Sequence, residues 1–438
     1  MRRSRLARST LPLLLATLAA CARTADEWLA ELASPEPFTR VLAVTALAEL
    51  GQQDALPQVL AALDDPSEEV RAAAGAALAR LGPPAMATLL SALKPGASAL
   101  DRERVLVSLP LLGPKAAEPL MAALFDGQHG TQAVLSALER LGPDATRSTL
   151  PGLIAALSSP APETRALAAE AIHAVDATDR DALAALLLAC RDGNPVVRTA
   201  ALEAAVGGLL ARMRLDGLSR AAAQSQLETL GDAALPALAR ALREAQPGTT
   251  TEPLAALAAF GPAALGPAFD QLYHRNPQHV QRAGALAVAI GPEALPALLE
   301  MLDSTDQRRH LLALTGLGAL KQAARPAVPR VLQDLHAGDP LVRWGAAYAL
   351  GLIGPTDDNQ LRELLALAAA SDHVIHEQIA PGLVEALLDR ISARPAEADA
   401  WRAALRELGQ DALPTLQHTA AGSGPRAKAA AEALAAPR

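Results

Sequence analysis

The residues whose spacing could hold a metal ion lie in SDHVIHEQ, residues 371–378. A helix here would place imidazole and carboxylate groups at i, i+3 and i+4 on one face, from Asp372, His373, His376 and Glu377. A His-Glu pair occurs once, at His376-Glu377, and HExxH, P-loop and GxSxG patterns are absent from the sequence. We therefore expect no metal, no cofactor and no catalytic residue. His274 and His279, in YHRNPQH, fit a solvated loop.

The first of the two cysteines, Cys21, follows a segment that has the layout of an export signal. Four arginines lie within the first eight residues, and an apolar stretch covers residues 11–20. This stretch contains Pro12 and is shorter than the roughly 20 apolar residues that span a bilayer. We expect residues 1–20 to be a signal peptide.

The tetrad Leu18-Ala19-Ala20-Cys21 resembles the lipobox of bacterial lipoproteins. The resemblance implies cleavage before Cys21 and its acylation, for example with palmitate, which would anchor the chain stably because several acyl chains share one residue. Ala22, in place of aspartate, implies the outer membrane, facing the periplasm. The alternative is an ordinary cleaved signal with a chance cysteine. Cys190 ends the apolar run LLLAC and is expected to be a small buried apolar residue.

Composition predicts an all-α protein. Hydrophobic residues make up 51% of the chain but aromatic residues only 2%, and alanine and leucine, both strong helix formers, predominate. The formal net charge is -8, and it would be -12 without the four arginines of the signal. Basic and acidic residues alternate along the chain, so we expect no nucleic-acid partner.

An apolar residue followed by glycine recurs along the chain, in many places at intervals of 29 to 31 residues. The recurring glycines are Gly51, Gly82, Gly113, Gly142, Gly231, Gly261, Gly291, Gly354 and Gly409, and Lys321 occupies the corresponding place between Gly291 and Gly354. In the copy at residues 65–93, apolar residues at helical spacing precede Gly82, and a second such run follows Pro83. Each unit is therefore a helical hairpin that needs its neighbours for stability.

Several copies place an arginine eleven residues before the glycine, after a turn such as Asp65-Pro66. This pattern resembles the HEAT repeat family, especially the bacterial HEAT-like repeats of phycobilin lyases. The resemblance implies a right-handed α-solenoid of about twelve HEAT-like hairpins, in which arginines and turn acids form a hydrogen-bonded ladder. The residues matching the ladder are Arg40, Arg71, Arg165, Arg198, Arg220, Arg343, Asp65 and Asp339. Ser34 and Ser159 replace the acid in two copies.

The expected order is a signal at 1–20, a lipidated tether and cap at 21–33, the solenoid at 34–421 and a C-terminal cap or frayed tail at 422–438. Trp28 would cover the first end of the core. The repeat is irregular near 207–220, where one helix is lost or fused, and at 355–409. The first irregular region contains Gly207, Gly208 and Gly217, and it is either a hinge or a decayed repeat.

In HEAT-like arrays the arginine-bearing helix lines the concave surface, and the positions one, two and five after the arginine point outward. This places Trp344 and Tyr348, together with Leu311, Leu312, Gln281 and Arg282, on a partner-binding surface. Tryptophan and tyrosine are frequent hot-spot residues at interfaces. The alternative is that both rings pack against the next repeat.

These features favour a membrane-anchored scaffold or adaptor in the bacterial envelope that binds a protein or peptide. The alternative is a HEAT-like repeat enzyme, lyase-like or metal-dependent, that acts on an envelope substrate. Deoxyhypusine hydroxylase is such a HEAT-repeat enzyme, but it carries several His-Glu pairs where this chain has one.

Overall fold

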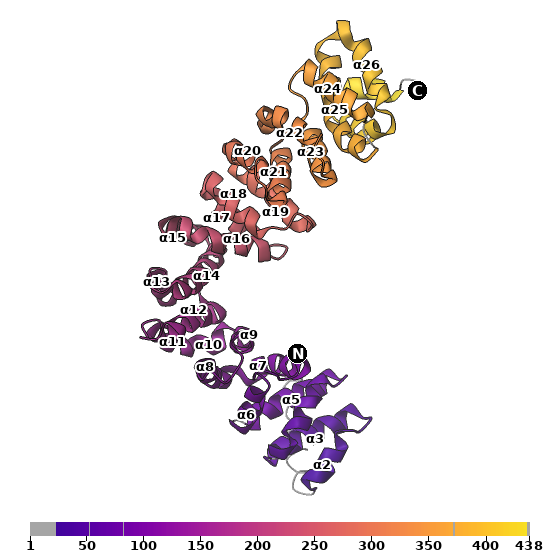
Figure 1. Ribbon diagram of the computed structural model, residues 1–438. Helices are drawn as coiled ribbons and strands as arrows, with labels where there is room; N and C mark the ends of the chain where they lie inside the picture. The colour runs from indigo at the N-terminus through magenta and orange to yellow at the C-terminus, as the bar shows by residue number, and fades with distance from the viewer. Residues whose placement is uncertain (1–22, 52, 82, 371–372, 436–438) are drawn as a thin grey trace. The chain divides into compact units, whose positions relative to one another are not determined.

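The computed structural model describes residues 23–51, 53–81, 83–370 and 373–435, and every regular element in these ranges is a helix (Figure 1). The all-α prediction is confirmed. The predicted signal at 1–20, Cys21, Gly82 and Asp372 lie outside the described residues. The chain divides into two compact units, with the boundary between Ala211 and Arg212.

Unit 1 is a stack of short helices joined by tight turns. α3 packs beside α5, α5 beside α7, α7 beside α9, and α9 beside α12. The helices are α2 (Ala25–Glu31), α3 (Pro37–Glu49), α4 (Leu56–Ala61), α5 (Glu68–Leu81), α6 (Pro83–Ser91), α7 (Ala99–Leu112), α8 (Ala117–Phe125), α9 (Thr131–Leu141), α10 (Pro143–Thr146), α11 (Leu150–Ala156), α12 (Pro162–Asp176), α13 (Arg180–Ala189) and α14 (Pro195–Arg212), whose last residue falls in unit 2.

Unit 2 repeats this organisation. α19, α21, α23 and α25 lie side by side in one row, and α18, α20, α22 and α24 form a second row against them (Figure 1). Stacked helical hairpins of this kind are an α-solenoid, as predicted. The helices are α15 (Gly217–Leu230), α16 (Leu235–Glu244), α17 (Thr251–Ala259), α18 (Leu265–Gln271), α19 (Pro277–Ile290), α20 (Leu295–Leu302), α21 (Gln307–Leu320), α22 (Val328–Asp334), α23 (Pro340–Ile353), α24 (Asp358–Ala370), α25 (His373–Ala393), α26 (Ala398–Glu407), α27 (Leu413–Ala420) and α28 (Pro425–Ala435).

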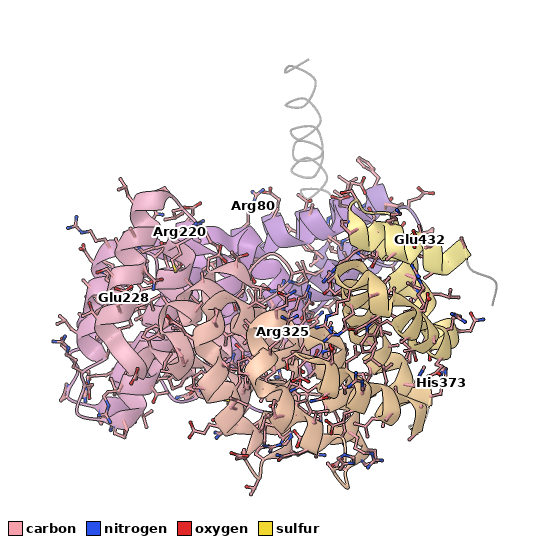
Figure 2. All side chains as sticks on the ribbon, turned by 90° about the horizontal axis from the view of Figure 1, so that it is seen from above. Arg80, Arg220, Glu228, Arg325, His373 and Glu432 are labelled. Atoms are coloured by element: carbon pink, nitrogen blue, oxygen red, sulfur yellow. The ribbon has the colours of Figure 1, made fainter. Side chains whose placement is uncertain are left out.

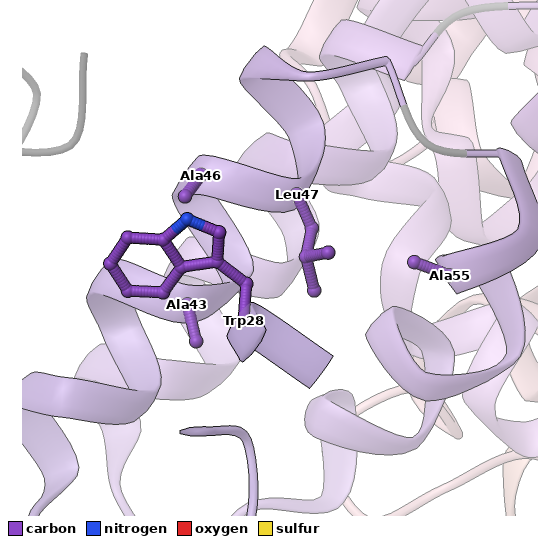
Figure 3. Close-up of a cluster of buried hydrophobic side chains, with 5 residues drawn as sticks. All are labelled: Trp28, Ala43, Ala46, Leu47 and Ala55. Carbon is purple, nitrogen blue, oxygen red and sulfur yellow. The ribbon is translucent and has the colours of Figure 1, made fainter. Parts of the chain in front are cut away.

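The first helix of unit 1 closes one end of its core. Thr24 and Glu27 form a capping box that starts α2, and Trp28 is only 2% exposed. Its ring lies against Ala43, Ala46 and Leu47 (Figure 3). This agrees with the role predicted for Trp28.

Glycines in the irregular regions allow helices to approach closely. α14 runs unbroken through Gly207 and Gly208, and an added Cβ would overlap His173 at the first and the carbonyl group of Ala177 at the second. The two glycines therefore permit contact with α12 and do not interrupt the helix. In the region 355–409, α25 is one long helix that contains Pro381.

Residues 425–435 form α28, which packs against α27 and α25. Ala427, Ala429 and Ala430 of this helix are buried, and Arg426 pairs with Asp389 of α25. The expectation of a frayed tail is therefore wrong for these residues, because small side chains give α28 an apolar face to bury.

In many hairpins, the turn between the two helices takes a backbone conformation that glycine adopts most easily. Gly291 and Gly354 have φ of 84° and 72°, and Lys321, in the corresponding place after α21, has φ of 50°. It is the sole non-glycine residue with positive φ among the described residues. A side chain costs about 1 kcal/mol or more in such a conformation.

We predict that Lys321→Gly raises the free energy of unfolding by about 1 kcal/mol, because glycine removes the backbone strain. The measurement is the midpoint of urea denaturation. Gln322→Gly is the matched control, and it should leave the midpoint unchanged or lower it. A midpoint that falls in Lys321→Gly would contradict the assignment of strain.

Candidate partner-binding surface

One arginine in each of five hairpins binds the turn that precedes its own helix. In every case Nη1 donates to two carbonyl oxygens, six and five residues earlier, at 2.7 to 3.2 Å. The five are Arg40, Arg71, Arg165, Arg198 and Arg343. This contact holds the turn against the helix and satisfies carbonyl groups outside it.

Two of these arginines also reach the next hairpin. Arg40 donates from Nε and Nη2 to both carboxylate oxygens of Asp65 at 2.7 Å, and Arg165 reaches Asp192 in the same way at 2.8 and 2.9 Å. Such bidentate pairs are strong and directional. The arginine hydrogen bonds hold the pKa of Asp65 and Asp192 below the ordinary value. Both are ladder rungs of the kind that the resemblance implied.

Two predicted ladder residues have other roles. Asp339 stands four residues before Arg343, whereas Asp65 stands six before Arg71. Asp339 therefore caps α23 by accepting from the Leu341 amide at 2.8 Å, and it also accepts from Gln307. Arg220 donates to the Met213 carbonyl group at 3.0 Å. Assigning them to the ladder was wrong, because Asp339 stands two residues closer to its arginine than Asp65 does, and Arg220 donates to a carbonyl group seven residues earlier.

Unit 2 has an ionisable contact at a ladder position that the sequence did not reveal. His310 has the same place in α21 as Arg343 in α23, and its Nε2 lies 2.9 Å from Oδ2 of Asp334. Arg330 donates to the other oxygen of Asp334 at 2.8 Å. A histidine thus occupies the ladder position of α21, but its carboxylate partner lies in α22, the second helix of the same hairpin.

An exposed apolar strip runs along α23. It comprises Leu341, Trp344, Tyr348 and Leu352, which are 44%, 43%, 36% and 36% exposed. The spacing of three and four residues places all four on one helix face. The rings of Trp344 and Tyr348 stack, with centroids 5.6 Å apart and planes at 9°. We call these four residues the aromatic strip.

The neighbouring helices of the row extend this surface. Leu311 and Thr315 of α21 are half-buried beside the strip, and Gln281 of α19 is exposed. Gly345 lets α23 approach α21, because an added Cβ would come within 3.3 Å of Leu311. One side of unit 2 therefore gives access to Trp344, Tyr348, Leu311 and Gln281.

Leu312 and Arg282 do not belong to this surface. Leu312 is fully buried and Arg282 is 7% exposed, with its guanidinium donating to the carbonyl groups of Arg243 and Ala245. Each stands two residues after the helix position that corresponds to Arg343. That second position faces into the row of helices, and Gly345 occupies it in α23. Their predicted role at a partner surface was wrong.

A pocket of about 90 Å³ lies where the strip ends at Leu352. Its charged lining residues are Lys321, Arg325, Glu385, Asp389, Arg390 and Arg426. Asp358 binds Arg390 at 2.7 Å, and Asp389 binds Arg426. The side chains of Lys321 and Arg325 make no hydrogen bond or ion pair with any described residue. Leu341 and Leu352 were not predicted at this surface, although their helical spacing from Trp344 was a usable signal in the sequence.

The histidines considered for metal binding have protein partners or face solvent. Nδ1 of His376 lies 2.5 Å from Asp411, and His373 projects from unit 2 with a 79% exposed side chain (Figure 2). Within the described ranges no three His, Cys, Asp or Glu residues are grouped as metal ligands. His279 is buried in α19, and its Nδ1 accepts a hydrogen bond from the Tyr273 amide at 3.1 Å. The prediction that His279 lies in a solvated loop was therefore wrong.

Cys190 is partly buried, and burial raises the pKa of its thiol to about 11. It is therefore protonated at neutral pH, which agrees with the prediction of a small apolar residue.

As for membrane spans, no single helix in the described ranges is long and apolar enough to cross a bilayer. One bent pair, Pro277–Ile290 with Pro292–Leu302, passes by length and composition, with a bend of 111°.

Residues 25–110 match the family model of HEAT repeats. No curated protein matches the chain. Among solved structures, an engineered protein is 18% identical, with 94% of this chain and 98% of that chain covered and a TM-score of 0.32. Kap95p in a structure with RanGDP is 12% identical over 94% of this chain and 66% of its own, with a TM-score of 0.35. Kap121p bound to Ste12p is 14% identical over 93% of this chain, with a TM-score of 0.36, and this chain spans about half (48%) of its length.

We predict that Asp192→Asn lowers the urea midpoint at pH 7, because the neutral amide cannot form the bidentate pair with Arg165. Since the pKa of Asp192 is lowered in the folded chain, its carboxylate stabilises the fold above about pH 4 and loses this effect as the pH falls through the folded pKa. The difference between wild type and variant should therefore shrink below pH 4. Asp144→Asn is the control, since its pair with Arg147 is exposed. A difference independent of pH would contradict this role.

Proposed function

We propose that this chain is a protein-binding scaffold and that unit 2 binds its partner through the aromatic strip. The observation that carries the proposal is the stacked, exposed pair of Trp344 and Tyr348. The chain has three tryptophans, and the other two, Trp28 and Trp401, are 2% and 6% exposed. A ring left 43% exposed in a chain that otherwise buries tryptophan favours a binding role over packing within the fold.

The geometry of the strip suits a protein surface or peptide. Stacking holds both rings in one orientation on a single helix, so little side-chain entropy is lost when a partner binds. The adjoining side chains are mixed, with Leu311 apolar, and Gln281 and Thr315 able to hydrogen-bond. An apolar centre with a polar rim is the usual composition of a protein interface.

We extend the proposal to the membrane. The Leu18-Ala19-Ala20-Cys21 tetrad supports cleavage before Cys21 and its acylation. Cys21 precedes the first residue of α2, Ala25, by four residues, so an acylated Cys21 would keep unit 1 close to the lipid surface. Ala22 favours the outer membrane, with the chain facing the periplasm.

Trp344→Ala and Tyr348→Ala should each weaken partner binding by about ten-fold or more, the size typical of hot-spot residues. The measurement is photocrosslinking in intact cells from a benzophenone side chain placed at Thr315, with quantification of each captured band. Tyr273→Ala is the matched control, because Tyr273 is a 53% exposed tyrosine away from the strip. If captured bands keep their intensity in both strip variants, the surface is assigned wrongly.

Cys21→Ser should abolish labelling of the chain by an alkynyl palmitate in growing cells, whereas Cys190→Ser should leave it unchanged. These are the two cysteines of the sequence, so each variant controls for the other. Ala22→Asp should move the labelled chain from outer-membrane to inner-membrane fractions. Labelling that persists in Cys21→Ser would refute the anchor.

A further inference from the structure

We infer that the partner segment is an extended peptide with a large apolar side chain and, three or four residues away, an aspartate or glutamate bound by Lys321 and Arg325. This inference rests on the proposed function of the aromatic strip. It adds the chemical type of a second contact, at Lys321 and Arg325, and the distance between that contact and the aromatic strip.

The strip and the pocket are continuous. Leu352 is the last residue of the strip and also lines the pocket. With a rise of 1.5 Å per residue, Trp344 lies about 12 Å along α23 from Leu352. An extended peptide covers this distance in three or four residues, at about 3.3 Å each. An apolar side chain on the stacked rings therefore places a carboxylate at the pocket with that spacing.

The free charges of the pocket favour an anion. Of its four cationic side chains, Arg390 and Arg426 are already paired with Asp358 and Asp389. Lys321 and Arg325 have no partner among the described residues, and the remaining acidic lining residue is Glu385. Two free cations beside one acid leave the pocket positive, although the whole chain carries -8. An acidic side chain is the peptide group that this local charge attracts.

The backbone at Lys321 supports a role for its side chain. The corresponding turns at Gly291 and Gly354 use glycine, while Lys321 holds a lysine at φ of 50°. Residues held in such conformations are concentrated at functional sites. This strained turn borders the pocket, as does the turn at Gly354. The fold thus accepts a less stable turn where a cation faces the end of the strip.

The test is selection of random twelve-residue displayed peptides on the purified full chain, followed by titration of a selected peptide. Enriched peptides should pair an apolar residue with an acid three or four residues away. Lys321→Gly, which we expect to be more stable than the wild type, should bind such a peptide about three-fold more weakly, and Lys321→Gly with Arg325→Ala about ten-fold. Lys428→Ala removes an exposed lysine elsewhere in unit 2 and should change nothing.

A second titration separates charge from folding effects. The same peptide with Gln in place of its acid should bind the wild type as weakly as the acidic peptide binds the double variant, and the double variant should not discriminate between the two peptides. Selected peptides that need Trp344 but show no acid, or equal losses for both peptides in Lys321→Gly, would overturn the carboxylate contact and leave the proposed function standing. Selection that yields no Trp344-dependent peptide would overturn both.

Discussion

Close packing between helices of the same row is the constraint on which the rest of the structure depends. A hairpin of about 30 residues has no core of its own, so each helix must bury two faces against its neighbours. Alanine and glycine make this possible, as at Gly351, where a Cβ would overlap the backbone of Gln378. Rows this close leave little room for rings. Trp28 therefore lies at the first end of the unit 1 core, and Trp344 lies on the surface.

Two local devices set the geometry that this packing needs. A residue with positive φ reverses the chain within a hairpin, as at Gly291. An arginine such as Arg71 holds the turn that precedes its own helix through two carbonyl groups. Both act over a few residues, so they fix the geometry of each hairpin locally. Ion pairs connect one hairpin to the next through charge, as in the bidentate pair of Arg40 with Asp65 and the pair of Arg80 with Glu49. Direct packing provides the remaining connections between neighbouring helices.

The sequence predicted what depends on local periodicity. It predicted the hairpins, the turn at Lys321 and the exposure of Trp344, because apolar spacing and turn residues act within one unit. It was wrong where the outcome depends on a neighbouring helix. Leu312 is buried because α21 has helices on both sides in its row, and Asp339 caps α23 because its turn places it four, not six, residues before the arginine. The pocket brings together residues from four elements, which no single repeat predicts.

The strip is therefore a property of the row and not of α23 alone. Gly345 faces Leu314 and Leu311, and a Cβ there would stand 3.1 Å from Leu314. A larger residue at 345 would push α23 away from α21 and separate Leu311 from Trp344, although neither would itself have changed. Binding that orders these neighbours would in turn stabilise their packing, because a ligand that binds only the folded state adds its binding free energy to the fold. In a stack without a single core, surface recognition and stability thus depend on the same helix contacts.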